Sequence, residues 1–133
     1  LGRDRCCKER RDQSMKTEQT EIAPQTTIDC FLAVDIRVGQ VIRAEPFPKA
    51  RNPAYKLWID FGDLGVRKSS AQVTKLYTPQ ELRGQQVLAV VNFPPRQVAD
   101  FMSEVLVLGV PTGEEAVVLI GPDREVPAGL RIL

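Results

Sequence analysis

Apolar side chains recur at every second position between Tyr55 and Phe61, where they alternate with polar residues and one tryptophan. A similar alternation runs through residues 35–45, and residues 66–73, after the turn-forming stretch Gly62–Gly65, are interpreted as the partner strand. A period of two places one set of side chains on a buried face and is typical of half-buried strands. The sequence therefore predicts a chain built mainly from antiparallel strands, with a hairpin between the second and third.

A short helix is predicted after these strands. Thr78-Pro79-Gln80-Glu81 has the pattern of a capping box, with proline at the first helical position, and Gly84 suits the end of the helix. A helical turn is also expected at 27–34. Apolar segments after the capping box predict further strands at 86–92, 104–110, 116–120 and 129–132.

This order of elements predicts an all-β domain, a five-stranded Greek-key OB-fold barrel with one short helix and additional C-terminal strands. An SH3-like barrel is the alternative that the pattern leaves open. Residues 105–110 and 116–120 are apolar on both faces, more than the inside of a small barrel can cover. We therefore expect the C-terminal strands to be used for dimerisation.

The composition excludes many functions. The chain of 133 residues contains no histidine and has a formal net charge of +1, so histidine-based catalysis and histidine-ligated metals are excluded. Its three cysteines lack a CxxC spacing, which argues against a zinc site and a disulfide framework and favours free thiols. We expect no enzyme activity, no catalytic residues, no cofactor and no metal.

Organisation and location follow from the same sequence. Residues 1–26 are interpreted as a flexible leader or arm, partly vector-derived or upstream, because they are polar and lack periodicity, and residues 27–133 as the domain. No apolar run approaches the roughly 20 residues of a membrane helix. We expect a cytoplasmic protein without membrane insertion.

Several segments resemble one known family. Asp35–Val41 (DIRVGQV) resembles the opening strand of the stand-alone tRNA-binding domain family, whose members occur alone or appended to methionyl- and phenylalanyl-tRNA synthetases. Further blocks are similar to its CsaA branch of export-related bacterial chaperones. These blocks are Ala44–Arg51, Tyr55–Gly62, Lys68–Gln72, Val90–Gln97 and Phe101–Gly109, and the resemblance covers residues 28–133.

The resemblance implies a homodimeric OB-fold chaperone that binds unfolded pre-export polypeptides in the general secretion pathway. It also implies the preprotein translocation ATPase and tRNA as candidate partners. The family's Ser-Gly-Ile reads Ser69-Ser70-Ala71 here, and its Ser-x-Gly-Met reads Ser103-Glu104-Val105-Leu106. Both departures favour peptide over tRNA, so a tRNA-binding accessory protein is the second hypothesis. Nucleic-acid binding should weaken steeply with salt, whereas apolar peptide capture should not.

Large apolar residues in or beside loops are the candidate peptide-binding residues, because an exposed apolar concavity suits extended chains. Trp58 joins them because the alternation points it outward, where it can stack on a base or anchor a peptide. The alternative is that these side chains pack the barrel ends or the dimer contact. The set is Phe47, Trp58, Phe93, Phe101 and Met102.

Basic and neutral polar residues of the second and third strands and nearby loops form a candidate nucleic-acid or polar groove, since this face of an OB barrel commonly binds ligands. A solvated charged face is the alternative. The set is Lys49, Arg51, Lys56, Arg67, Lys68, Ser69, Ser70, Gln72, Asn92, Arg96, Ser103 and Glu104.

Overall fold

The computed structural model describes residues 21–114 and 116–133, and the chain divides into two units, 1–34 and 35–133. The first unit contains helix α2 (Ile28–Leu32), whose N-cap Thr27 accepts a hydrogen bond from the Cys30 amide at 3.3 Å. The expectation of free thiols is wrong for Cys30, which forms a disulfide bond. The predicted arm, residues 1–26, lies outside the described residues up to position 20. No helix in the described part is long and apolar enough to span a membrane.

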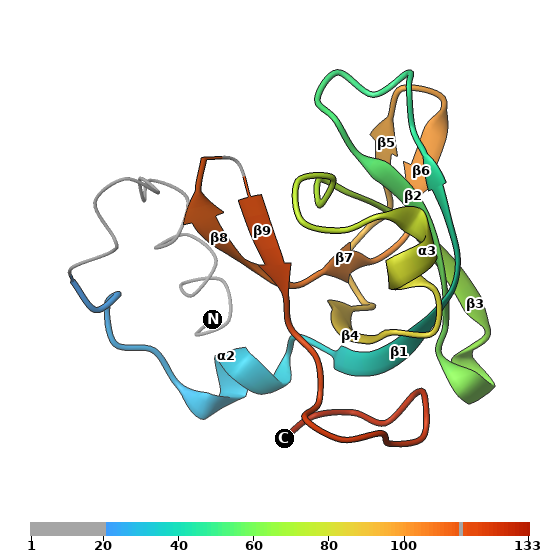
Figure 1. Cartoon of the computed structure of the whole chain (residues 1–133). Helices are drawn as coiled ribbons and strands as arrows, with labels where there is room; N and C mark the ends of the chain where they lie inside the picture. The colour runs from blue at the N-terminus through green and yellow to red at the C-terminus, as the bar shows by residue number, and fades with distance from the viewer. Residues whose placement is uncertain (1–20, 115) are drawn as a thin grey trace. The chain divides into compact units, whose positions relative to one another are not determined.

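The second unit is built on a five-stranded antiparallel sheet with the order β3-β2-β1-β4-β7 (Figure 1). Along β2 the apolar residues Leu57 and Ile59 are buried, as the predicted alternation requires. Leu57 pairs with Ala44 of β1 on one side and with Ser69 of β3 on the other. The sheet curls into a nearly closed barrel, which confirms the predicted fold. Its strands are β1 (Ile36–Pro46), β2 (Tyr55–Asp60), β3 (Val66–Ala71), β4 (Gln86–Val90) and β7 (Leu106–Val107), with the 3-10 turn η1 (Gly62–Leu64) between β2 and β3.

Side chains help to close the barrel between β3 and the segment before β7. The Glu104 amide donates to the Lys68 carbonyl at 2.7 Å, and the Lys68 amide donates to the Glu104 carboxylate at 3.0 Å. Next to them the buried Ser69 hydroxyl donates to the Val105 carbonyl at 2.9 Å. We call this junction the seam. Here a backbone bond and several side-chain bonds take the place of a regular strand ladder.

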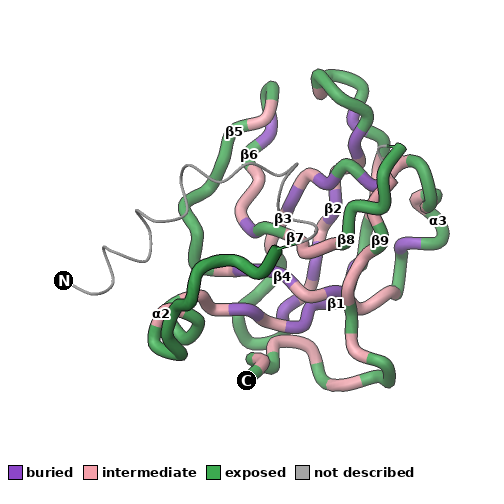
Figure 2. Tube along the Cα trace, turned by 90° about the vertical axis from the view of Figure 1, so that its left-hand side faces the viewer, coloured by how far each residue is buried: buried purple, intermediate pink, exposed green. Residues whose placement is uncertain are grey.

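The barrel core lies inside this sheet, and Figure 2 shows buried positions gathered on β1, β2 and β4. Leu57, Ile59 and Phe61 have no exposed surface, as the alternation predicts. Gly39 of β1 lies so close to them that an added Cβ would stand 2.4 Å from Ile59 Cγ2. The barrel core consists of Val41, Leu57, Ile59, Phe61, Ala71, Val73, Leu82, Val87, Ala89 and Val105.

The predicted capping box is confirmed at helix α3 (Pro79–Leu82). The Thr78 amide donates to Glu81 Oε1 at 2.9 Å, and the Glu81 amide donates to Thr78 Oγ1 at 3.2 Å. These reciprocal bonds satisfy two amides that have no partner within the helix. The cap fixes where the helix begins, and Leu82 at its end is fully buried in the barrel core.

The chain after β4 differs from the prediction. A hairpin of β5 (Arg96–Val98) and β6 (Phe101–Ser103) occupies a stretch expected to be a connector. The single strand expected at 104–110 is instead β7 followed by β8 (Gly109–Gly113), which pairs with β9 (Ala116–Leu119).

The sequence predicts a final short strand at residues 129–132. In the structure these residues lie along the first part of β1. The Gly129 amide donates to the Val38 carbonyl at 2.7 Å, and the Ile132 amide donates to the Ile36 carbonyl at 3.0 Å. An isolated bridge joins Arg37 to Arg131. The predicted strand is therefore realised as a short pairing with β1.

Candidate functional site

A second, smaller apolar cluster lies outside the barrel. The loop between β1 and β2 contributes Phe47 and Ala54, and the β5–β6 hairpin contributes Phe101 (Figure 1). The Phe101 ring meets Phe47 edge-on at 5.5 Å between centroids and Trp58 of β2 at 6.0 Å, a favourable aromatic geometry. We call this group, with Ala50 and Val98 packed against it, the satellite cluster. It joins the loop and the hairpin to the outer face of β2.

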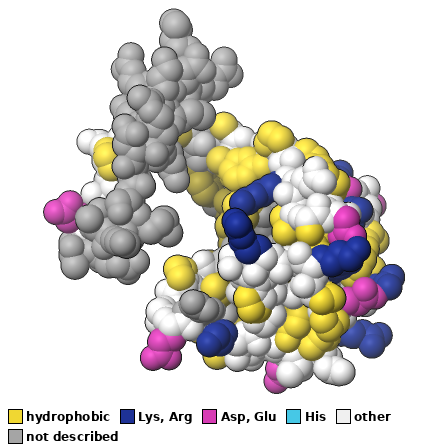
Figure 3. All heavy atoms as spheres, turned by 90° about the horizontal axis from the view of Figure 1, so that it is seen from above, with side chains coloured by type: hydrophobic (Ala, Val, Ile, Leu, Met, Phe, Trp, Pro, Cys, Tyr) yellow, Lys and Arg dark blue, Asp and Glu magenta, His cyan; other side chains and the backbone are white. Residues whose placement is uncertain are grey.

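Three cations cover the rings of this cluster. Lys56 Nζ lies 4.9 Å from the Phe47 centroid and 5.2 Å from that of Phe101, while Lys68 Nζ lies 5.1 Å from Phe101. The Arg43 guanidinium lies 4.5 Å from the Trp58 ring. Figure 3, which views the molecule from above, shows Lys and Arg side chains directly beside hydrophobic ones. These charges are therefore engaged with aromatic faces.

An ion pair also joins the loop to the hairpin. Lys49 Nζ lies 2.9 Å from Asp100 Oδ2, and both side chains are largely exposed. The hydrogen bond between them lowers the pKa of the Asp100 carboxyl and raises the pKa of the Lys49 ammonium. Because exposed pairs are screened by water and salt, this contact orients the two segments more than it stabilises them.

A cleft of about 560 Å³ opens between the loop, β3 and the hairpin. We call it the loop–hairpin cleft. The satellite cluster supports it through Ala50, Ala54 and Val98, and the seam contributes Glu104 and Val105. Its lining residues are Ala50, Arg51, Asn52, Ala54, Ser70, Gln72, Phe93, Pro94, Arg96, Val98, Ser103, Glu104, Val105 and Leu106.

The cleft combines apolar surface with unpaired cations. Phe93 is 45% exposed. Arg51 and Arg96 are both exposed, and within residues 21–114 and 116–133 neither guanidinium has an ion-pair or hydrogen-bond partner. Ser103 Oγ accepts a hydrogen bond from the Ser70 amide at 3.2 Å. The arrangement can bind a ligand that offers both apolar groups and negative charge.

The structure gathers part of the predicted polar set into this cleft. It brings together Arg51, Ser70, Gln72, Arg96, Ser103 and Glu104. Six other members lie outside the lining. Lys49, Lys56 and Lys68 make the contacts given above, and Ser69 lies in the seam. Arg67 of β3 is half-buried and pairs with Ile59 of β2, and Asn92 Oδ1 accepts a hydrogen bond from the Asp35 amide at 2.9 Å.

The predicted peptide-binding residues divide in the same way. Phe93 lines the cleft. Phe47 and Phe101 are only 3% and 6% exposed, and they support the cleft from the satellite cluster together with Trp58. Met102 is 40% exposed and does not line the cleft, because its neighbours Phe101 and Ser103 occupy the other face of β6.

Some lining residues were not predicted. Asn52 lies in the β1–β2 loop, and Pro94 precedes the unforeseen hairpin. Val98 and Leu106 also contribute apolar surface. The Pro94-Pro95 pair beside Phe93 was the one local signal available, since prolines interrupt strands and leave neighbouring side chains on loops.

A charged cluster at the start of β1 lies outside the cleft lining. Arg37 Nε lies 2.7 Å from Asp35 Oδ1, Arg131 Nε lies 3.5 Å from the same oxygen, and Arg37 also donates to the Gly129 carbonyl at 3.0 Å. The hydrogen bond from Arg37 lowers the pKa of Asp35 below its usual 3.8. This cluster connects the chain end to β1.

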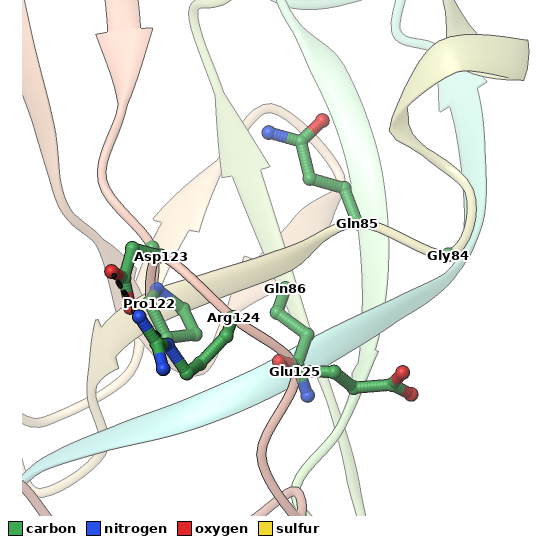
Figure 4. A pocket seen from close by; sticks show the side chains of 8 residues that line it. Gly84, Gln85, Gln86, Pro122, Asp123, Arg124 and Glu125 are labelled. Carbon is green, nitrogen blue, oxygen red and sulfur yellow. Dashed lines mark hydrogen bonds and ion pairs between the residues drawn. The ribbon is translucent and has the colours of Figure 1, made fainter.

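A further cavity of about 460 Å³ lies between the start of β4 and residues 121–125 (Figure 4). The side chain of Gln86 is occupied with the backbone of Val126, and Asp123 pairs with Arg124. The side chains of Arg124 and Glu125 extend in opposite directions from the backbone. The described residues contain no group of three or more His, Cys, Asp or Glu side chains placed to hold a metal ion. The loop–hairpin cleft is therefore the better candidate site.

The barrel with a cleft beside its second and third strands defines a small binding domain of the OB type. The family model described as "Putative tRNA binding domain" matches residues 36–131, and the chain belongs to this family. The crystal structure of the chaperone CsaA from Bacillus anthracis is similar, with 52% identity, a TM-score of 0.80, and coverage of 83% of this chain and 100% of that chain. The CsaA chaperone protein from Picrophilus torridus is 48% identical with a TM-score of 0.76, over 82% of this chain and 100% of that one.

Larger proteins carry the same domain. The methionine–tRNA ligase of Chlorobium chlorochromatii is 34% identical over 117 residues, which cover 88% of this chain. The chain spans only 16% of that ligase's length. The likeness therefore concerns one domain of the ligase.

Proposed function

We propose that this protein is a homodimeric chaperone without catalytic activity, which binds unfolded pre-export polypeptides in the general secretion pathway. The observation that carries the proposal is the loop–hairpin cleft, where exposed Phe93 lies among apolar side chains and hydrogen-bonding groups. The similarity to two CsaA chaperones supports it. The proposal places the protein in the cytoplasm, with the preprotein translocation ATPase as a partner.

The chemistry of the cleft suits ligands of variable sequence. Apolar contacts are non-directional, so Phe93, Pro94 and Leu106 can accept different aliphatic or aromatic side chains. Asn52 and Gln72 each offer an amide donor and acceptor to a peptide backbone. Such a surface holds an extended segment without demanding one sequence, as a chaperone for many clients requires.

The proposed dimer would use the C-terminal strands. Val110 of β8 and Val118 of β9 are 49% and 39% exposed. Apolar strands left in water favour association, and a two-fold interface is the simplest way to cover them. Two clefts on one particle would also hold a long unfolded chain more tightly than one cleft.

Titration of a fluorescently labelled unfolded preprotein segment tests the proposal. Phe93→Ala should weaken binding about tenfold, because an anchoring aromatic side chain contributes roughly 1–2 kcal/mol. The matched control is Leu64→Ala, which truncates another exposed apolar residue outside the cleft. Equal binding by both variants, or no binding by the unchanged protein, would contradict the proposal.

Binding of tRNA is the second candidate function. It is favoured by the family match and by Arg51 and Arg96, which have no partner among the described residues, since arginines track phosphate backbones. Titration with tRNA at about 50 and 200 mM salt distinguishes the two, because contacts to several phosphates lose orders of magnitude in affinity over that range. Capture of apolar segments should change little.

A further inference from the structure

The loop–hairpin cleft has an excess of uncompensated positive charge. Arg51 comes from the β1–β2 loop and Arg96 from the start of β5, and both line the cleft. Both are exposed, and neither has a partner among the described residues. Other cations nearby differ, because Lys49 pairs with Asp100 and Lys56 lies against aromatic rings. The two arginines are thus available to a ligand.

The acidic group of the cleft is already engaged. Glu104 is the one acidic residue among the described residues that line it, and its Oε1 accepts the Lys68 amide at 3.0 Å. The Glu104 amide is bonded to the Lys68 carbonyl as well, so the residue is held in the seam from both sides. Its single negative charge balances only one of the two arginines, and within the described residues it forms an ion pair with neither.

Apolar surface lies among these charges. Phe93 and Pro94 lie in the segment that leads into β5. Val98 is two residues beyond Arg96, so Arg96 and Val98 share one face of the strand. A ligand that fills this surface brings its neighbouring groups within reach of the arginines. Guanidinium groups pair well with carboxylates, and a lysine or arginine in the same place would be repelled.

We propose that the cleft selects extended polypeptide segments in which an acidic side chain stands next to apolar ones, and that Arg51 and Arg96 are the specificity-determining residues. This inference rests on the proposed function, because it names the segments that such a chaperone prefers. Apolar contacts give affinity in this scheme, and the arginines choose among apolar segments of similar size. Repulsion of basic segments contributes to the choice along with attraction of acidic ones.

The test compares two short unstructured peptides that differ only in charge. One carries two glutamates beside a Leu-Phe pair, and the other carries glutamines in their place. The acidic peptide should bind the full-length protein about fivefold more tightly at low salt, since exposed charge pairs each contribute about 0.5 kcal/mol. The double substitution Arg51→Gln with Arg96→Gln should reduce this ratio to about one. Arg83→Gln, which removes an exposed arginine outside the cleft, should leave it unchanged.

A charge reversal provides a gain of function that a folding defect does not mimic. Arg51→Glu with Arg96→Glu should prefer a third peptide, with lysines in place of the glutamates. Equal binding of the acidic and amide peptides by the unchanged protein would overturn the inference and leave the proposed function standing. Binding of neither peptide, together with binding of single-stranded RNA that weakens in the double glutamine variant, would overturn both.

Discussion

The barrel core and the satellite cluster are both apolar, but they are built differently. The barrel core is enclosed by strands, and several of its side chains have no exposed surface at all. The satellite cluster has Phe47, Ala54 and Phe101 at its centre, and lysine ammonium groups lie over its rings. The barrel core is enclosed mainly by strands paired through backbone hydrogen bonds, whereas the satellite cluster is covered by side chains.

The difference separates stability from binding. A large, dry core makes the cooperative unit that resists unfolding. A small cluster that joins one loop to one hairpin adds less stability, but it sets the distance between the two walls of the cleft. Substitutions in the two regions should therefore have different ratios of lost stability to lost affinity.

The largest expected effect is in the barrel. Phe61→Ala removes a fully buried ring and should lower the free energy of unfolding by about 4 kcal/mol. The affinity of the remaining folded protein for an unfolded peptide should stay unchanged. Denaturant unfolding and peptide titration of the same preparation measure both quantities. If the variant does not fold, Phe61→Leu gives the same comparison with a smaller cavity. Loss of affinity without loss of stability would contradict the assignment.

The next effect is in the satellite cluster. Phe101→Ala should cost about 3 kcal/mol, the lower end for a buried phenylalanine, because few neighbours surround the ring. It should also weaken peptide binding about tenfold, since the hairpin loses its contacts with Phe47 and Trp58. The same two measurements apply. An affinity equal to that of the unchanged protein would show that the cluster does not position the cleft.

A smaller effect is expected at the seam. Ser69→Ala removes the hydroxyl that donates to Val105 in a buried setting and should cost about 1–2 kcal/mol. The matched control is Ser70→Ala, which keeps the backbone amide that Ser70 donates to Ser103. Thermal or denaturant unfolding distinguishes the two variants. Equal stability of both would mean that the bond from Ser69 to Val105 does not stabilise the seam.

The smallest effect concerns acid. Arg37 lowers the pKa of Asp35 in the folded state. The ionised carboxylate therefore stabilises the protein at pH values above 3.8, its usual pKa, and this contribution is lost as the pH falls through the lowered pKa. Asp35→Asn should remove roughly 1 kcal/mol or less of the stability difference between about pH 6 and pH 3. In the exposed pair near the satellite cluster, Asp100→Asn should change this difference less, and added salt should abolish its effect. A larger acid effect for Asp100 would reverse the comparison.

Local patterns were sufficient to predict most of the barrel. The alternation in Tyr55–Phe61 predicts both a strand and its buried face, and Thr78 with Glu81 predicts where α3 begins. These signals depend on residues a few positions apart, so a single sequence contains them. The hairpin of β5 and β6 lacks such a signal because its strands are three residues long, and its turn uses Ala99 at a φ of 53° instead of a glycine.

The site was predicted less completely for a related reason. Arg51, Ser70 and Arg96 were grouped because OB barrels bind ligands beside the second and third strands, and the structure places them in one cleft. The burial of Phe47 and Phe101 depends on the packing of a loop against a hairpin that is distant in sequence. No periodicity within either segment predicts that contact.

The seam and the cleft share Glu104, and Ser103 and Ser70 are bonded across the same junction. A ligand bound in the cleft therefore shields the hydrogen bonds of the seam from solvent. Deuterium uptake at the Lys68 and Ser70 amides should slow when a client is bound, so these two positions report occupancy of the cleft from within the barrel wall.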